Sequence, residues 1–287
     1  MRRFSQVDVF SAEPMLGNPV AVVHGADGLS TEEMARFARW TNLSETTFLL
    51  PPTRPGADYR LRIFTPGGEL PFAGHPTIGS AHAWLEAGGV PASEDAVVQE
   101  CGAGLVQLRR EAAAGGRLAF AAPPLVRSGP VSDDHRRAIC RALRLTDAEI
   151  VDTAWVDNGP GWVAVLLEDA DAVLAVRPDY AAFGDLEIGL VAPYRKVGGV
   201  GRSEASAAAD VEVRAFVPTM GIGEDPVTGS FNAGVAQWLA GDRLPTSYVA
   251  AQGTVLGRRG RVHVSVEDGV VWVGGDARTT VSGEVDL

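Results

Sequence analysis

The chain has 287 residues and a mass of 30.1 kDa, a length typical of two domains with sizeable cores. Its 25 Lys and Arg residues against 36 Asp and Glu residues give a formal net charge of −11, which argues against a nucleic-acid partner. A composition of 46% hydrophobic and 21% charged residues indicates a globular protein. The apolar runs are too short to cross a bilayer, so we expect no membrane-spanning segment.

The N-terminal residues and the two cysteines indicate a reducing compartment. Residues 1–4 lead directly into the strand-like residues 7–10, without the apolar stretch and small-residue cleavage site of a secretory signal. Cys101 and Cys140 form neither a closely spaced pair nor a disulfide framework. We therefore expect a cytoplasmic protein. The single lysine, Lys196, lies in a glycine-rich stretch and is a poor candidate for Schiff-base chemistry.

In chain order, the first half is predicted to contain a well-capped helix followed by a strand. Ser30 and Glu33 form a capping-box pattern, and apolar residues follow at helical spacing to a predicted end near Asn42. A strand over residues 46–50 should come next, because its apolar residues are stopped by the prolines that follow.

The second half is predicted to be richer in strands. Ser132 is a candidate cap for a helix that continues to Leu143. A glycine-, alanine- and serine-rich segment, residues 197–209, is expected to be a loop. The segments with strand character are residues 151–156, 162–167, 211–217, 262–266 and 270–273.

Three short sequence matches recur in the same order in both halves, and we interpret them as an internal repeat. Each half has a helix-like segment that ends in Trp-Leu, and the segment after the second match is four residues longer in the second half. This predicts a second helix that is longer by about one turn. The matched pairs are residues 62–66 with 214–218, 75–80 with 225–230, and 18–23 with 160–165.

The repeat and the mixture of elements predict an α+β fold of two pseudo-symmetric lobes, in which mixed sheets wrap around helices. A proline-containing junction near residues 121–124 separates the halves. The expected lobes are residues 1–120, with residues 280–287 as a candidate addition, and residues 121–279.

The repeated Pro–Gly–Ser segment is the most informative feature of the repeat. A turn that enters a helix presents free backbone N–H groups, which bind carboxylates or phosphates. The alternative is that Pro and Ser only start helices. The first positions hold His75 and Asp225, which would form a pair suited to proton handling if they faced each other across a cleft. The alternatives are a structural histidine and an N-cap.

Glu45 is a candidate general base because it lies where the first predicted helix gives way to an apolar strand. Burial there would raise the pKa of its carboxyl group. The alternative is a solvated turn residue. We expect no metal site, because His75 and His82 are the only closely spaced histidines and no third ligand lies near them. Neither a phosphate loop nor a G-x-S-x-G elbow occurs.

Four ordered motifs, residues 17–23, 41–48, 72–77 and 224–230, resemble those of the PhzF-like proteins, which are named for phenazine biosynthesis and share the diaminopimelate-epimerase fold. The resemblance covers essentially the whole chain. It implies two lobes, each with a sheet around a central helix, an active site between them, and a homodimer.

The resemblance also implies roles for individual residues. The family's catalytic glutamate corresponds to Glu45, and its supporting residues correspond to His75 and Asp225. The implied ligands of the substrate are Ser44, the backbone of Gly74 with His75, and the backbone of Gly229 with Ser230. No cofactor is implied.

The epimerases with this fold use two cysteines, whose places here correspond to Ala73 and Thr228, so a two-thiol mechanism is disfavoured. We therefore expect a cofactor-independent isomerase that shifts a proton within a small, unsaturated, carboxylated metabolite, with Glu45 as base and then acid. One alternative is a hydrolase in which Glu45 activates water to cleave a natural-product intermediate. The other is a metabolite-binding protein without turnover.

Overall fold

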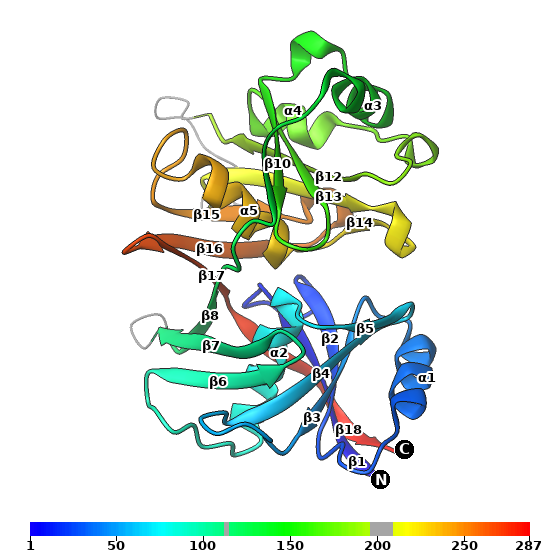
Figure 1. Ribbon diagram of the computed structural model, residues 1–287, viewed down its shortest axis with the longest axis vertical. Coiled ribbons are helices and arrows are strands. Elements are labelled where there is room, and N and C mark those ends of the chain that lie inside the picture. Colours follow the sequence, from blue (N-terminus) through cyan, green and yellow to red (C-terminus); the bar gives the residue numbers. More distant parts are fainter. Residues whose placement is uncertain (112–114, 196–208) are drawn as a thin grey trace. The chain divides into compact units, whose positions relative to one another are not determined.

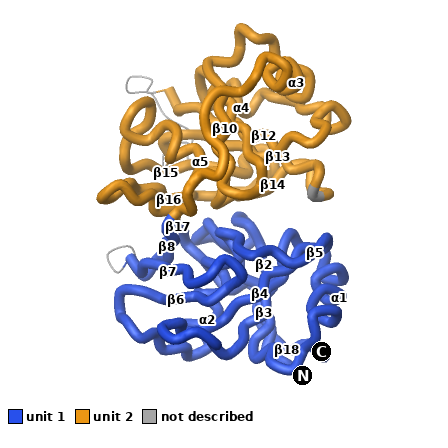
Figure 2. Tube along the Cα trace, in the orientation of Figure 1, with its two compact units in different colours: residues 1–121, 274–287 blue, residues 122–273 orange. Residues whose placement is uncertain are grey.

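The computed structural model describes residues 1–111, 115–195 and 209–287, which form two units (Figures 1 and 2). Unit 1 comprises residues 1–121 and 274–287, and unit 2 comprises residues 122–273. Apart from Ala209, the segment predicted as a loop, residues 197–209, lies outside the described residues.

Unit 1 combines a mixed sheet with two α-helices among its described residues. The helices are α1 (Thr31–Thr41) and α2 (Gly74–Glu86). The strands are β1 (Arg2–Val9), β2 (Asn18–Val23), β3 (Thr46–Leu50), β4 (Tyr59–Thr65), β5 (Gly68–Leu70), β6 (Ala96–Cys101), β7 (Gly104–Glu111), β8 (Arg117–Ala121) and β18 (Ala277–Val285).

The sheet of unit 1 surrounds α2. Strand β1 pairs antiparallel with β2 and β18, β2 is parallel to β3, and β3 is antiparallel to β4. Strand β4 is antiparallel to β5 and parallel to β6, and β6, β7 and β8 follow in antiparallel order. Helix α2 contacts β1, β2, β3, β8 and β18, and its residues 74–81 are all buried. This burial explains why small and apolar residues predominate in the first eight positions of the helix.

Unit 2 contains the remaining elements, and β17 (Val270–Gly275) spans the boundary between the units. The strands are β9 (Arg127–Pro130), β10 (Asp152–Asp157), β11 (Trp162–Leu166), β12 (Glu187–Pro193), β13 (Val211–Val217), β14 (Ile222–Asp225), β15 (Ser247–Gln252) and β16 (Gly260–Glu267). The helices are α3 (Asp133–Leu143), α4 (Ala170–Ala175) and α5 (Gly229–Leu239), with 3-10 helices η2 (Asp147–Glu149), η3 (Tyr180–Ala182), η4 (Pro218–Met220) and η5 (Thr254–Leu256).

The strand pairings of unit 2 repeat those of unit 1 in the same order. Strand β10 is antiparallel to β11, β11 is parallel to β12, and β12 is antiparallel to β13. Strand β13 is antiparallel to β14 and parallel to β15, which is antiparallel to β16. Helix α5 contacts β10, β11 and β16, so it is the counterpart of α2. The prediction of an α+β fold with two similar halves is confirmed.

Locally determined elements agree with the sequence. Ser30 and Glu33 form both bonds of the capping box, and α1 ends at Thr41, followed by the C-cap residue Asn42, whose φ of 55° is left-handed. Ser132 caps α3 by accepting from the backbone N–H of His135. The predicted strands of both halves coincide with β3, β10, β11, β13, β16 and β17 to within two residues.

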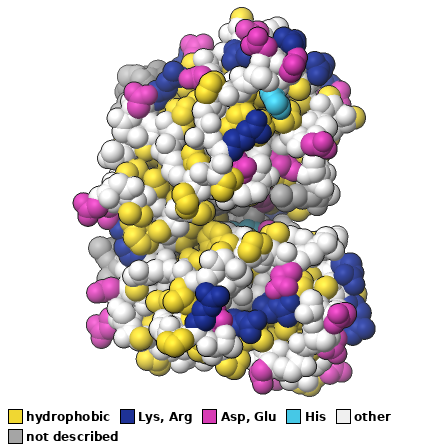
Figure 3. Space-filling model, viewed as in Figure 1, with side chains coloured by type: hydrophobic (Ala, Val, Ile, Leu, Met, Phe, Trp, Pro, Cys, Tyr) yellow, Lys and Arg dark blue, Asp and Glu magenta, His cyan; other side chains and the backbone are white. Residues whose placement is uncertain are grey.

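On the face shown in Figure 3, basic side chains lie in small groups among acidic ones.

The predicted register of one match, residues 75–80 with 225–230, is wrong by five residues. Residues 225–230 lead into α5 as expected, but residues 75–80 lie inside α2, which has already begun at Gly74. The second helix is also not longer, since α2 has 13 residues and α5 has 11. Pro76 is tolerated because it lies in the first turn, where its missing N–H has no intrahelical acceptor to lose.

The structure instead aligns residues 69–79 with residues 224–234, which share the pattern Glu-x-Pro-x-x-Gly-x-x-x-x-Gly. Its first glycine begins each helix after an extended N-cap residue. Its second glycine, Gly79 or Gly234, lies against a strand. A Cβ atom at Gly79 would lie 2.4 Å from Cγ1 of Val20, and one at Gly234 would lie 2.5 Å from the carbonyl oxygen of Val156.

Candidate functional site

Glu45 and His75 come together in unit 1 although they are 30 positions apart in the sequence. Glu45 lies in the bend between α1 and β3, and His75 is the second residue of α2. Oε2 of Glu45 is 3.3 Å from Nε2 of His75, and the two side chains are only 15% and 7% exposed. The alternative of a solvated turn residue at Glu45 is therefore wrong.

The imidazole of His75 is neutral at physiological pH. Burial lowers its pKa to about 3, and a hydrogen bond to the backbone of Pro19 opposes this only in part. Proline offers only a carbonyl acceptor, so a ring N–H of His75 donates to it. Nε2 has no hydrogen bond to the protein, so the donor is Nδ1 and Nε2 presents its lone pair to Glu45.

Ser44 and Gly74 flank this pair on the chain. Ser44 is half-buried in the same bend as Glu45. Gly74 is buried at the start of α2, where the N-cap residue Ala73 makes no side-chain capping bond. The backbone N–H groups of Gly74 and His75 belong to the first turn of α2, so they have no acceptor within the helix. This end of α2 therefore carries the partial positive charge that attracts an anion.

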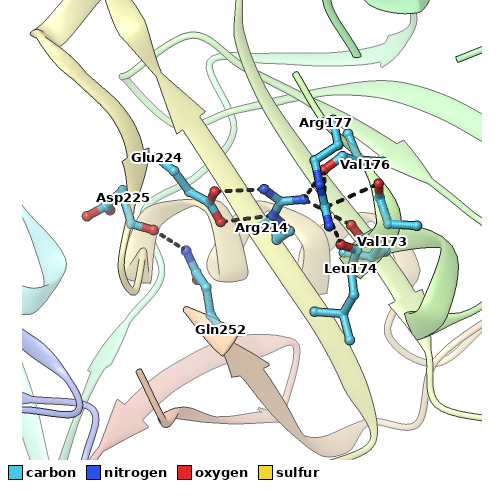
Figure 4. A network of polar contacts seen from close by, with 9 residues as sticks. Val173, Leu174, Val176, Arg177, Arg214, Glu224, Asp225 and Gln252 are labelled. Carbon is cyan, nitrogen blue, oxygen red and sulfur yellow. Dashed lines mark hydrogen bonds and ion pairs between the residues drawn. The ribbon is translucent and has the colours of Figure 1, made fainter. Parts of the chain in front are cut away.

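In unit 2, Asp225 is the last residue of β14, and it is not an N-cap, because α5 begins at Gly229 after the N-cap residue Thr228. Oδ2 of Asp225 accepts a hydrogen bond of 2.6 Å from Oγ1 of Thr228. Its carbonyl oxygen accepts from the side chain of Gln252 at 3.1 Å (Figure 4). The carboxyl group is thus held in place from within its own unit.

Gly229 and Ser230 begin α5, and Thr228 makes no side-chain capping bond to them. Two residues that the sequence patterns missed hold Ser230. Nε1 of Trp162 donates to Oγ of Ser230 at 3.0 Å, and Nδ2 of Asn158 donates to its carbonyl oxygen at 2.9 Å. Trp162 did lie within a matched segment of the repeat, whereas Asn158 gave no recognisable signal.

One Arg–Glu ion pair precedes α2, and an equivalent pair precedes α5. Nε and Nη2 of Arg214 donate to the two carboxylate oxygens of Glu224 at 2.9 and 2.8 Å, and the side chains are 3% and 5% exposed. Arg62 donates in the same way to the two carboxylate oxygens of Glu69, at 2.7 and 2.6 Å, and we call this two-bond arrangement the Arg–Glu fork. The side chains of Arg62 and Glu69 are more exposed to solvent than those of the other pair. Nη1 of Arg214 also donates to carbonyl oxygens at the end of α4 (Figure 4). The sequence signal was the repeated Arg-x-Phe of β4 and β13.

The aligned halves carry different chemical groups at equivalent positions. His75 corresponds to Ser230, and Asp225 corresponds to Leu70. The structure brings Ser44, Glu45, Gly74 and His75 together in unit 1. It places Asp225, Gly229 and Ser230 on one short segment of unit 2.

The described residues contain no cluster of three or more His, Cys, Asp or Glu side chains arranged for a metal ion. Within the same residues, no helix combines the length and the apolarity needed to span a bilayer.

Comparison with known proteins shows similarity over nearly the whole chain. The family described as "Phenazine biosynthesis-like protein" matches residues 7–285. The chain is 37% identical to antisense-enhancing sequence 1 of Schizosaccharomyces pombe, covering 98% of this chain and 97% of that protein. It is 36% identical to trans-2,3-dihydro-3-hydroxyanthranilate isomerase of Pseudomonas aeruginosa, covering 93% and 91%. A crystal structure of a PhzF-family phenazine biosynthesis protein from Enterococcus faecalis matches with a TM-score of 0.78 and 25% identity, covering 100% and 99%.

Proposed function

Because the chain belongs to the phenazine biosynthesis-like family, we propose that it is a cofactor-independent isomerase that shifts a proton within a small, unsaturated, carboxylated metabolite. Its relatives include proteins named as isomerases, one of which acts on trans-2,3-dihydro-3-hydroxyanthranilate. The observation that carries the proposal is the contact between the Glu45 carboxyl group and the neutral His75 ring.

In the proposed mechanism, the Glu45 carboxylate takes a proton from a substrate carbon. The electron pair of the broken C–H bond enters the conjugated system of the substrate. Nε2 of His75 then accepts a hydrogen bond from the protonated Glu45. Glu45 returns a proton to another carbon, so the substrate and product have the same composition. Acid–base catalysis of this kind contributes about 10²–10⁴-fold to the rate.

The substrate carboxylate is proposed to be held by backbone N–H groups at the starts of the two helices, Gly74 with His75 and Gly229 with Ser230. The uncapped first turns of α2 and α5 support this assignment. Ser44 would bind a polar group of the substrate beside Glu45. Asp225 would orient another.

We also propose that the protein works in the cytoplasm as a homodimer. Cys101 and Cys140 are both free thiols, which supports a reducing compartment. Light scattering on the purified protein tests the homodimer, because a dimer has twice the chain mass of 30.1 kDa.

The test of the proposed function is turnover of trans-2,3-dihydro-3-hydroxyanthranilate by the wild type and by Glu45→Gln. We expect a product of unchanged mass in water, with deuterium incorporated when the solvent is D2O. Glu45→Gln should keep the fold and lose turnover by about 10²–10⁴-fold. The control is Glu32→Gln, on the exposed first turn of α1, which should keep full activity.

Near-normal turnover by Glu45→Gln would refute the assignment of Glu45. A product heavier by one water, or cleaved, would support the hydrolase alternative instead. Binding of the probe without any product would support the metabolite-binding alternative.

A further inference from the structure

Gln252 is a buried polar residue to which the proposed chemistry gives no role. It is the last residue of β15 and has no solvent exposure. Figure 4 shows its side chain directed at Asp225. A buried amide is costly unless its hydrogen-bonding groups all find partners, so the contacts of Gln252 indicate what it does.

The side-chain amide of Gln252 makes four hydrogen bonds, all to the segment that runs from Asp225 into α5. Nε2 donates to the carbonyl oxygen of Asp225 at 3.1 Å and to Oγ1 of Thr228 at 2.9 Å. Oε1 accepts from the backbone N–H of Thr228 at 2.9 Å and from Nδ2 of Asn232 at 3.0 Å. Two donated and two accepted bonds use the full capacity of a primary amide.

Two of these partners determine which terminal atom of the Gln252 amide is the oxygen and which is the nitrogen. The carbonyl oxygen of Asp225 can only accept, and the backbone N–H of Thr228 can only donate. Exchanging the oxygen and nitrogen of Gln252 would place acceptor against acceptor and donor against donor. The orientation of the amide is therefore determined by the backbone alone.

The orientation of the amide in turn determines that of the Thr228 hydroxyl group. Oγ1 of Thr228 receives a hydrogen from Gln252, so its single hydrogen is left for Oδ2 of Asp225, 2.6 Å away. Oδ2 is consequently a hydrogen-bond acceptor. The order of donation runs from Gln252 through Thr228 to Asp225.

We infer that Gln252 is a positioning residue for Asp225, which it holds directly at the backbone and through Thr228 at the carboxyl group. The inference rests on the proposed function, in which Asp225 orients the substrate. Gln252 touches neither Glu45 nor His75 through any of these bonds, so it acts only through Asp225 and Thr228.

Unit 1 offers a matched control in Gln99, which is also fully buried and lies on β6, the counterpart of β15. Nε2 of Gln99 donates to Oγ1 of Thr77 at 3.1 Å, and its Oε1 accepts from the hydroxyl group of Tyr59 at 3.0 Å. A substitution of Gln99 therefore disturbs an equally buried amide without touching Asp225.

The test compares Gln252→Glu, which replaces the donating nitrogen by an oxygen, with Gln99→Glu. It also compares Thr228→Val, which removes the hydroxyl group at nearly constant shape, with Thr228→Ser, which keeps it. The measurements are kcat and KM for trans-2,3-dihydro-3-hydroxyanthranilate, with a thermal melt to confirm folding.

We expect Gln252→Glu and Thr228→Val to lower kcat by at least about 10-fold with KM within about 3-fold, because a misplaced orienting group affects the chemical step most. Thr228→Ser should have most of the wild-type kcat, and the kcat of Gln99→Glu should equal that of the wild type. Wild-type kcat in Thr228→Val, or an equal loss of kcat in Gln99→Glu, would overturn the inference.

If the wild type does not convert the probe, the proposed function fails for that substrate, and the role of Gln252 is tested without turnover. Asp225→Ala, Gln252→Glu and their combination then form a double-mutant cycle in urea unfolding. A combined shift of the midpoint clearly smaller than the sum of the single shifts supports the positioning role. Additive shifts refute it.

Discussion

Nε2 of His75 lies 3.3 Å from Oε2 of Glu45, and the ring meets the carboxyl group as a neutral hydrogen-bond acceptor. Burial at the start of α2 disfavours the imidazolium form and keeps the ring neutral, although the hydrogen bond to Pro19 opposes this in part. The carbonyl of Pro19 engages Nδ1–H, so Nε2 is the acceptor. A proton taken up by Glu45 therefore has an acceptor in place before the substrate arrives.

The neutral state of His75 predicts how stability depends on pH. Its pKa is about 3 in the folded protein against a reference value of 6.5, so the unfolded chain binds more protons between these values. Stability is therefore complete above pH 6.5 and is lost as the pH falls from 6.5 toward 3. The expected contribution is on the order of a few kcal/mol.

Urea unfolding of the wild type and of His75→Gln over this pH range measures that contribution. The variant should have a flatter dependence on pH. His24, whose pKa burial lowers to about 4, adds a dependence of the same sign that both proteins share. Parallel curves for the two proteins would contradict a neutral, buried His75.

The duplicated Arg–Glu fork provides a comparison between a buried and a more exposed copy of one interaction. Arg214→Met should destabilise by about 3–5 kcal/mol, because it leaves Glu224 buried without its partner. Arg62→Met should cost about 1 kcal/mol or less, because Glu69 can turn toward solvent.

Urea unfolding at neutral pH measures both costs. Combining Arg214→Met with Glu224→Met removes both charges and should recover most of the loss. A double variant as unstable as Arg214→Met alone would show that capping the carbonyl groups of α4, rather than pairing with Glu224, is what makes Arg214 necessary.

The second glycine of each aligned pattern should resist substitution by alanine. In an ordinary helix interior, Gly→Ala stabilises by about 1 kcal/mol. At Gly234 the added Cβ would meet the backbone of Val156 at 2.5 Å, so we expect Gly234→Ala to destabilise by roughly 1–3 kcal/mol. Gly283→Ala is the control, since nothing lies within 4 Å of its added Cβ. A shift in melting temperature of the same sign and size for both variants would contradict the close approach of α5 to β10.

Trp162 should contribute to substrate binding through Ser230. Trp162→Phe keeps an aromatic ring against Phe231 but removes the N–H that holds Oγ of Ser230 at 3.0 Å. We expect KM to rise by about 3–10-fold, which corresponds to the loss of one hydrogen bond of roughly 1 kcal/mol. Trp155→Phe, on the neighbouring strand β10, controls for loss of a buried indole and should leave KM unchanged.

Features that depend only on neighbouring residues could be predicted from the amino-acid sequence. The capping box of Ser30 and Glu33, the left-handed end of α1 at Asn42 and the strand at residues 46–50 are local, so their signals are complete within a few positions. The family motifs selected Glu45, His75 and Asp225 as candidates, and the repeat correctly predicted two similar halves.

The register of the match between residues 75–80 and 225–230, and the protonation and hydrogen bonding of the candidate groups, became clear only from the folded structure. The Pro–Gly–Ser segments match in sequence but do not occupy equivalent positions in the structure. The equivalent positions are shown by the glutamates that pair with Arg62 and Arg214. They are also shown by the close approach of Gly79 and Gly234 to strands. The neutral state of His75 likewise arises from partners distant in the chain, as does the direction of hydrogen-bond donation from Gln252 through Thr228 to Asp225. Burial and hydrogen-bond direction are properties of the folded surroundings, which no local pattern of residues encodes.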